Sequence, residues 1–555
     1  MRGSCLALIG LLFVSMAPAA EVTLLTAGRI HTSDPQNPVA TAIAWDESGR
    51  VIAVGESASL RDRYPQAHRI DAAGKTVIPG LIDAHGHLMG LGFSLMTADL
   101  TGTRSKQEIL ERLRDYERQL APGAWLTGGG WDQNDWPEKQ FPTAADLDAA
   151  FPQRPVWLDR VDGHAGWANT AAMRAAAARS GRSLDGDWHP DGGRIERANG
   201  KATGVFVDGA MSLVVAAMPP ADDATREKAA ARAFAAAVEH GLTGVHDMGV
   251  SREDLALYKR FADSGRLPLR IDAYADGDSQ ALADLCTQGL YRHAGGRLEM
   301  RGVKLYMDGA LGSRGAALLQ DYSDDHGNRG LLVTDPVAYE AAVRKAHGCG
   351  VQVATHAIGD RGNRLVLDTY ARVLGEDAAS MDHRWRVEHA QIVALDDIPR
   401  FARMGVIASM QPTHATSDMP WAEDRVGPDR VLGAYAWQRF LHSGARLALG
   451  SDFPVESVDP RLGLYAAVTR QDREGQPPGG WQPEQRLSAA EAVRGFTADA
   501  AYAGRDEDQV GQLRAGLRAD FVILDEDPLS VPSASLDDLH IRSTWVDGKP
   551  VYQVR

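Results

Sequence analysis

The middle of the chain alternates short apolar runs of β-type residues with helical stretches rich in Ala and Leu, the pattern of βα units around a parallel sheet. Eight parallel strands can close into a barrel, so we expect an α/β fold with a TIM-type (β/α)8 barrel over residues 78–504. Helical candidates at 225–240 and 337–347 lie between the runs. The eight runs are residues 80–87, 242–248, 269–275, 302–307, 351–356, 385–389, 406–411 and 447–451.

Two further parts of the chain do not fit a simple barrel. The segment between the first two runs is too long for one βα connection and has its own strand-like runs, so we expect an inserted subdomain at 88–240. An insertion at this point rises from the C-terminal face of a barrel, where active sites lie. Residues 21–77 and 505–555 carry short β-type runs separated by turn signals, which predicts a small β-sandwich domain built from both chain ends.

The composition is that of a globular protein, with 44% hydrophobic and 24% charged residues. The net charge of −15, without a run of Lys or Arg, argues against a nucleic-acid partner. Residues 1–20 have a positive start, an apolar centre and a small-residue end, which predicts a signal peptide and a periplasmic or secreted protein. After its removal no segment is apolar enough to be transmembrane. Cys286 and Cys349 then remain, and the sequence leaves open whether they pair.

Polar residues end several of the apolar runs. The first run ends in His85 and His87, and alternate side chains of a strand point to the same side, so both can bind one metal ion. An ionisable group in the mouth of a barrel requires a partner. A single such residue is more often a satisfied buried group, but recurrence in separate strands favours one shared site. The further strand-end residues are Lys304, His356, His389 and Asp452.

The order His-x-His, Lys, His, His, Asp resembles the amidohydrolase superfamily, and within it family 3, the YtcJ-like and N-substituted formamide deformylase-like proteins. The matching motifs extend over nearly the whole mature chain. They are Gly80-Leu81-Ile82-Asp83-Ala84-His85-Gly86-His87, Gly130-Trp131-Asp132, Asp162-Gly163-His164, Lys304-Leu305-Tyr306-Met307-Asp308-Gly309-Ala310-Leu311-Gly312-Ser313-Arg314, His356-Ala357-Ile358-Gly359-Asp360, Glu388-His389-Ala390 and Gly450-Ser451-Asp452-Phe453-Pro454.

The resemblance implies a metal centre in which the lysine is carboxylated and bridges two ions. If Lys304 is an ordinary ammonium, one ion held by the histidines and Asp452 is the simpler alternative. Mixed nitrogen and oxygen ligands make a divalent metal, zinc first, the expected cofactor, with manganese, iron and cobalt left open. The implied ligands are His85, His87, Lys304, His356, His389 and Asp452.

These ligands predict hydrolysis by a metal-activated water, and the resemblance implies that the bond cleaved is a carbon–nitrogen bond. A bound divalent metal lowers the pKa of its water to about 7 and polarises a carbonyl. Asp452 is the candidate general base and acid, which takes the proton of the water and passes it to the departing amine. Small-molecule N-substituted formamides and N-acyl amines are the first substrates to consider. A deaminase or a cyclic-amide hydrolase is the nearest alternative, and a non-catalytic binding or regulatory barrel is a further one; a homo-oligomer is left open.

Five residues are candidates for contact with the substrate. Trp131, Asp132 and His164 come from the inserted segment and face the substrate in this interpretation, with simple packing as the alternative. Arg314 could bind a carboxylate or a carbonyl oxygen, because guanidinium suits planar anions; the alternative is an ion pair within its loop. His414, after the seventh run, is expected to line the pocket.

Overall fold

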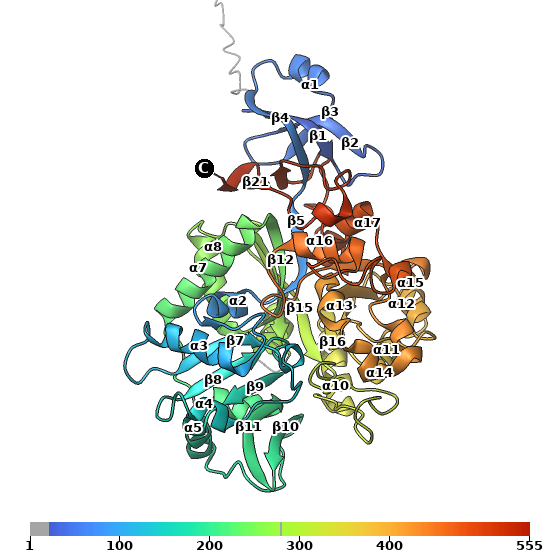
Figure 1. Cartoon of the computed structure of the whole chain (residues 1–555). Helices are drawn as coiled ribbons and strands as arrows, with labels where there is room; N and C mark the ends of the chain where they lie inside the picture. Colours follow the sequence, from blue (N-terminus) through green and yellow to red (C-terminus); the bar gives the residue numbers. More distant parts are fainter. Residues whose placement is uncertain (1–20, 278–279, 555) are drawn as a thin grey trace, which may run out of the picture.

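The computed structural model describes residues 21–277 and 280–554. The expected signal peptide, residues 1–20, lies outside this part of the chain. Three sheets organise the described residues (Figure 1). A sheet built from both chain ends lies at one end of the molecule, the barrel lies in the middle, and the sheet of the inserted segment lies at the opposite end.

The barrel contains the eight expected strands. They are β5 (Leu81–Gly86), β12 (Leu242–Val250), β13 (Arg270–Asp276), β15 (Leu298–Tyr306), β16 (Gln352–Ala357), β17 (Arg386–His389), β18 (Ile407–Met410) and β19 (Leu447–Leu449). They pair in parallel in this order, and the short β14 (Tyr291–Arg292) pairs antiparallel with β15 outside the barrel. The N–H of Asp452, just after β19, donates to the carbonyl oxygen of His85 at 2.7 Å, which brings the last strand back to the first. The TIM-type barrel is therefore confirmed.

Helices cover the outside of the barrel, and the two helices expected from the sequence are present as α7 and α10. Asp335 caps α10, because its carboxylate accepts from the N–H groups of Val337 and Ala338 at 2.9 and 3.1 Å. The helices are α7 (Asp223–Glu239), α8 (Arg252–Asp263), α9 (Gln280–Gln288), α10 (Pro336–Gly348), α11 (Asp360–Leu374), α12 (Ile398–Met404), α13 (Pro412–Asp418), α14 (Ala422–Arg430), α15 (Trp437–His442), α16 (Pro460–Thr469), α17 (Ala489–Gly495) and α18 (Ala498–Ala503).

The inserted segment folds around its own six-stranded sheet, in the order β10-β11-β9-β8-β7-β6. Its strands are β6 (Ala98–Asp99), β7 (Leu126–Trp131), β8 (Val156–Arg160), β9 (Ala165–Ala168), β10 (Gly193–Ala198) and β11 (Lys201–Asp208). Its helices are α2 (Leu88–Ser94), α3 (Lys106–Glu117), α4 (Ala144–Asp148), α5 (Thr170–Ser180) and α6 (Ser212–Val215). A separate hydrophobic core fills this part, so it packs as a unit of its own beside the barrel.

The two chain ends share one seven-stranded sheet in the order β22-β21-β20-β4-β1-β2-β3. The strands are β1 (Thr23–His31), β2 (Val39–Trp45), β3 (Val51–Gly55), β4 (His68–Pro79), β20 (Phe521–Leu524), β21 (Ile541–Val546) and β22 (Lys549–Gln553), and α1 (Ser57–Arg63) follows β3. The rings of Trp45 and Trp545 are 6.1 Å apart, although β2 and β21 are four positions apart in the sheet. A flat sheet would separate them by roughly 19 Å, so the sheet folds over and forms the expected sandwich.

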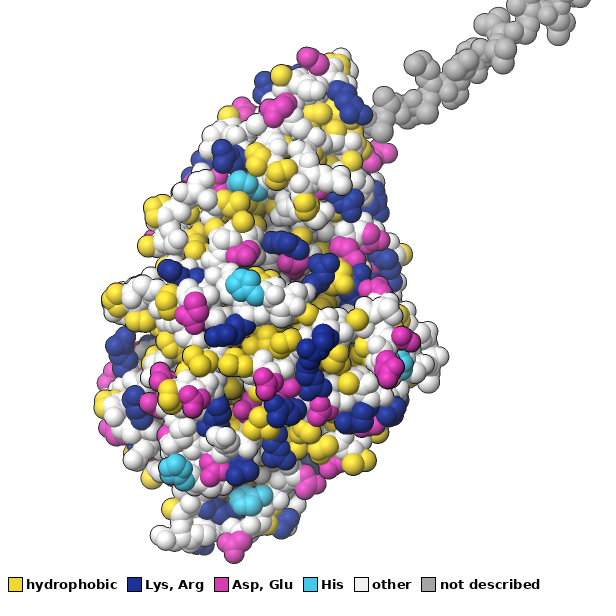
Figure 2. All heavy atoms as spheres, turned by 90° about the vertical axis from the view of Figure 1, so that its right-hand side faces the viewer, with side chains coloured by type: hydrophobic (Ala, Val, Ile, Leu, Met, Phe, Trp, Pro, Cys, Tyr) yellow, Lys and Arg dark blue, Asp and Glu magenta, His cyan; other side chains and the backbone are white. Residues whose placement is uncertain are grey.

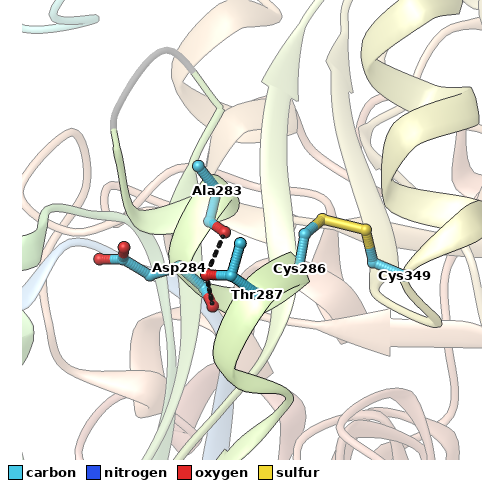
Figure 3. Close-up of a disulfide and its surroundings, with 5 residues drawn as sticks. All are labelled: Ala283, Asp284, Cys286, Thr287 and Cys349. Carbon is cyan, nitrogen blue, oxygen red and sulfur yellow. Dashed lines mark hydrogen bonds between the residues drawn. A yellow bond between two sulfur atoms is a disulfide. The ribbon is translucent and has the colours of Figure 1, made fainter.

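A disulfide joins two parts of the barrel's outer layer. Cys286 in α9 and Cys349 directly after α10 are bonded, with 5.0 Å between their Cα atoms (Figure 3). The pairing that the sequence leaves open is thus present, and it ties residues 63 positions apart.

The surface is mixed in charge. Acidic and basic side chains are interspersed over the face in Figure 2, so the net charge of −15 is not collected there in one patch. Within the part of the chain that the structure describes, no helix combines the length and the apolar character needed to cross a membrane.

Candidate metal centre

The six expected ligands meet at the C-terminal ends of the barrel strands. Asp452 Oδ1 lies 3.1 Å from His87 Nε2 and 3.4 Å from His85 Nε2. Lys304 Nζ lies 2.9 Å from His85 Nε2. The ring of His389 is 4.7 Å from that of His85 and 4.6 Å from that of His356, centroid to centroid. Six residues from five different strand ends therefore converge, because parallel strands bring their carboxyl ends to one edge.

Hydrogen bonds fix which nitrogen of three histidines faces this centre. Nδ1 of His85 lies 2.6 Å from a carboxylate oxygen of Glu388, Nδ1 of His87 lies 2.8 Å from the carbonyl oxygen of Met248, and Nδ1 of His389 lies 2.9 Å from Oε1 of Gln411. An oxygen of these kinds accepts, so each Nδ1 carries the proton and each Nε2 keeps a lone pair. Metal-binding histidines are oriented in this way.

Burial leaves the site with unpaired acceptors. His356 is buried, and its Nε2 has no hydrogen-bond partner among the described residues. Burial is the main cause that lowers the pKa of His85, His356 and His389, so these rings are neutral at neutral pH. Neutral imidazoles around a carboxylate whose Oδ1 also has no hydrogen-bond partner among the described residues are what a divalent cation requires. The residues present therefore fit a metal ion.

Two charged groups complete the centre. Burial opposes the charge of Asp452, but His85 and His87 outweigh it and hold the pKa of this carboxyl below its usual range. Burial lowers the pKa of Lys304 to about 8, so in a fraction of the molecules its side chain is a neutral amine near neutral pH. Non-glycine residues with positive φ are uncommon, and His389 and Asp452 have φ of 72° and 63°. This strain is of the kind stored at functional sites.

His164 lies over the centre and belongs to the inserted segment. Its Nδ1 is 2.6 Å from Asp208 Oδ1, and its ring is 5.1 Å from that of His356. Burial opposes protonation, but Asp208 raises the pKa of His164 to about 9, so the ring is positively charged at neutral pH. His164 and His87 keep side-chain exposures of 21% and 30%, which leaves the centre open on their side.

Trp131, Arg314 and Asp132, expected to contact the substrate, are instead engaged with other residues of the protein. Trp131 is fully buried in the core of the inserted segment, and its indole N–H donates to the carbonyl oxygen of Leu158 at 2.8 Å. Its assignment as a substrate contact is wrong in this structure, since a side chain without exposed surface cannot touch a ligand. Arg314 forms an ion pair with Asp324 at 2.9 Å, the alternative left open by the sequence.

Asp132 is also engaged with a protein partner. Its carboxylate and that of Asp162 flank the guanidinium of Arg160, with N–O distances of 2.5 Å each. Arg160 is buried, so these two carboxylates neutralise a charge that would otherwise be costly. Asp132 therefore serves the structure of the inserted segment, and the sequence-based assignment to substrate is not supported by this geometry.

The sequence did not identify the groups behind the ligands. Glu388 binds His85 and is itself held by Arg386, whose Nε and Nη2 donate to the two carboxylate oxygens at 2.7 and 2.9 Å. The available signal was the spacing of Arg386 and Glu388, two residues apart in an otherwise apolar run. Alternate residues of a barrel strand face the interior, so this spacing indicates a buried ion pair. Asp208, the partner of His164, stands in no motif, so only the folded chain reveals it.

Residues 69–552 match the family model described as the amidohydrolase family. This chain belongs to that family. The match covers most of the chain, and with it the expectation of an amidohydrolase, an enzyme that hydrolyses carbon–nitrogen bonds, is confirmed.

Individual relatives agree with the family match. This amidohydrolase is 34% identical to YtcJ of Bacillus subtilis (strain 168) over 521 residues, 92% of this chain and 96% of that protein. It is 29% identical to the N-substituted formamide deformylase of Arthrobacter pascens over 553 residues, 94% and 97% of the two chains. A crystal structure of an uncharacterized metal-dependent hydrolase from Pyrococcus horikoshii OT3 superposes with a TM-score of 0.74 at 28% identity, covering 92% and 99% of the two chains.

The burial of Trp131 yields a prediction that separates packing from substrate contact. Trp131→Phe should lower the free energy of unfolding by about 1–2 kcal/mol, through lost packing and the unpaired carbonyl of Leu158, and leave KM unchanged. Urea unfolding and steady-state kinetics on the same preparation measure both. A raised KM with unaltered stability would restore the substrate assignment.

Proposed function

We propose that this chain is an exported metal-dependent hydrolase that cleaves the carbon–nitrogen bond of a small amide, with N-substituted formamides and N-acyl amines as the substrate class. The observation that carries the proposal is the pair of Nε2 atoms of His85 and His87 directed at Asp452, each ring oriented by an acceptor at Nδ1. The substrate class draws on the name of the Arthrobacter pascens relative, which is a deformylase of N-substituted formamides.

In this proposal the six strand-end residues hold one or two divalent ions, zinc first. When bound, such an ion supplies a water of lowered pKa and polarises the substrate carbonyl. Asp452 takes the proton of the attacking water and returns it to the departing amine, a transfer worth typically about 10²–10⁴ in rate. His164, positively charged through Asp208, supplies a donor on the side of the inserted segment and binds an oxygen of the substrate.

Lys304 supports the two-ion form of the centre. A neutral amine adds to carbon dioxide and releases one proton, which leaves a carbamate with two oxygens on the side chain. With its pKa lowered to about 8, Lys304 has a larger neutral fraction at neutral pH than an exposed lysine. The carbamate would bridge two ions and turn a buried cation beside His85 into an anion that favours metal.

Metal content tests the centre directly. We expect about two ions per wild-type chain and one or none in Lys304→Ala, because the bridging oxygens are lost. Elemental mass spectrometry on protein purified without a metal-affinity tag makes the measurement. One ion in both proteins would establish the single-ion form and remove Lys304 from the mechanism. No ion even after reconstitution with zinc would overturn the metal centre.

A turnover screen tests the reaction. N-substituted formamides and N-acyl amines should release an amine, while hydantoins and aminated rings should be poor substrates; a combined His85→Ala and His87→Ala protein, checked for folding by circular dichroism, should be inactive. Activity confined to hydantoins or aminated rings would favour the cyclic-amide hydrolase or deaminase. Release of neither amine nor ammonia from any amide would overturn the proposed function.

Export has two independent supports. The first twenty residues have the sequence pattern of a signal peptide, and the two cysteines that follow are paired in the structure. Disulfides persist in oxidising compartments such as the bacterial periplasm and are rare in the cytosol.

The exported protein should therefore begin near Ala20 or Glu21 and contain no free thiol. Mass spectrometry of the intact protein, with and without a thiol-alkylating reagent, measures both features. An unprocessed chain that accepts alkylation at Cys286 and Cys349 without prior reduction would contradict export.

A further inference from the structure

We propose that His414 is a neutral hydrogen-bond donor to the carbonyl oxygen of the substrate, and that Gln391 is the positioning residue that places its proton. This inference rests on the proposed function, since it adds a catalytic residue to the same site. The sequence suggests only that His414 lines the pocket.

The proton of His414 is assigned by its neighbour. His414 is buried in α13, and its Nδ1 lies 2.9 Å from Nε2 of Gln391. An amide nitrogen donates and does not accept, so Nδ1 of His414 is the acceptor of this hydrogen bond. A neutral imidazole has one proton, which must then sit on Nε2.

The other histidines of the centre have the opposite arrangement. Nδ1 of His85, His87 and His389 faces an oxygen, which leaves the lone pair on Nε2. The rings of His389 and His414 lie 5.9 Å apart and nearly parallel, at 24°, and each is held by a glutamine amide. One presents a lone pair and its neighbour presents an N–H. The structure thereby distinguishes a ligand from a donor.

The amide of Gln391 lies between His414 and Tyr435. Gln391 is buried, and its backbone carbonyl oxygen accepts from the N–H of Tyr435 at 2.8 Å. Its Oε1 lies 3.5 Å from the hydroxyl of Tyr435, whose proton is donated to Asp418. The amide nitrogen faces His414, and the carboxylate of Asp452, with Oδ2 3.7 Å from Nε2 of His414, favours a proton on that ring nitrogen.

The resulting N–H points into the reaction site and has no partner. Nε2 of His414 is buried without a hydrogen bond among the described residues, 3.7 Å from Oδ2 of Asp452. A buried donor without an acceptor is costly, and such a group in a folded protein requires an explanation. The acceptor we assign is the carbonyl oxygen of the amide, which gains negative charge when water attacks its carbon beside Asp452.

The competing interpretation is that His414 is a metal ligand. Ligand atoms of His389, His414 and Asp452 lie within 4.8 Å of one another, close enough to hold an ion. A protonated Nε2 cannot bind a metal, so the two interpretations exclude each other as long as Gln391 donates. Metal content separates them.

The decisive experiment compares His414→Phe with wild type. Phenylalanine keeps a ring against His389 but has no N–H, so we expect kcat for an N-substituted formamide to fall by about 10²–10³, the usual loss for one oxyanion donor. KM and the metal content of the chain should change little. A fall in metal content would make His414 a ligand and overturn the inference, and an unchanged kcat would also overturn it.

Gln391→Glu tests the positioning residue, with Gln411→Glu as the matched control for an added carboxylate. At position 391 a carboxylate accepts from Nδ1 and raises the pKa of His414, as Asp208 does for His164. At a pH above about 9, where the ring is neutral, its one proton then sits on Nδ1 and Nε2 has none, so kcat should fall as in His414→Phe. At position 411 the new group keeps the acceptor role toward His389, and the loss of kcat should be at least about tenfold smaller. Equal losses in the two variants would overturn the assignment of the proton.

The wild-type measurements separate this inference from the proposed function. A wild type that binds no metal or hydrolyses no amide overturns both together. A wild type that binds metal and hydrolyses amides, combined with variants at His414 and Gln391 that keep its kcat, overturns the donor alone.

Discussion

The site depends on the buried arginine Arg386, whose side chain lies inside the barrel with no exposed surface. Its guanidinium donates to both oxygens of Glu388, to the carbonyl oxygen of Ala84 at 2.5 Å and to the hydroxyl of Ser409 at 2.7 Å. Three strands are joined in this way, and Glu388 in turn orients His85. A buried arginine is tolerated only when its donors are paired. The hydrogen bonds that pair the donors of Arg386 join the barrel strands and also hold Glu388, which orients His85.

The groups that face Nδ1 of each histidine explain how one pocket can hold histidines with different roles. Glu388 makes His85 an acceptor at Nε2, whereas the amide of Gln391 makes His414 a donor. The residue type is the same in both cases, and the chemistry is set by the atom that faces Nδ1. Site assignments in this family of folds therefore require the second layer of residues as well as the motif.

The sequence predicted the barrel and the convergence of the six strand-end residues, because parallel strands bring their carboxyl ends together whatever the loops do. It failed at Trp131, since alternation along a strand does not say which face of the inserted sheet is covered by its own helices. Arg314 was undecided for a related reason: its partner Asp324 is chosen by loop geometry. Gln391 and Asp208 act through contacts across 23 and 44 residues of sequence, and no local pattern marks them.

The sandwich built from both chain ends has a consequence for synthesis of the protein. Strand β4 ends at Pro79 and pairs along one edge with β20, which begins at Phe521. At translation rates of about 5–20 residues per second, the intervening stretch keeps that edge of β4 unpaired for roughly 20–90 s. An open edge is a template for pairing with another chain. The nascent protein thus has an unpaired strand edge near its beginning, and this edge is covered only after β20, close to the end of the chain, has been made.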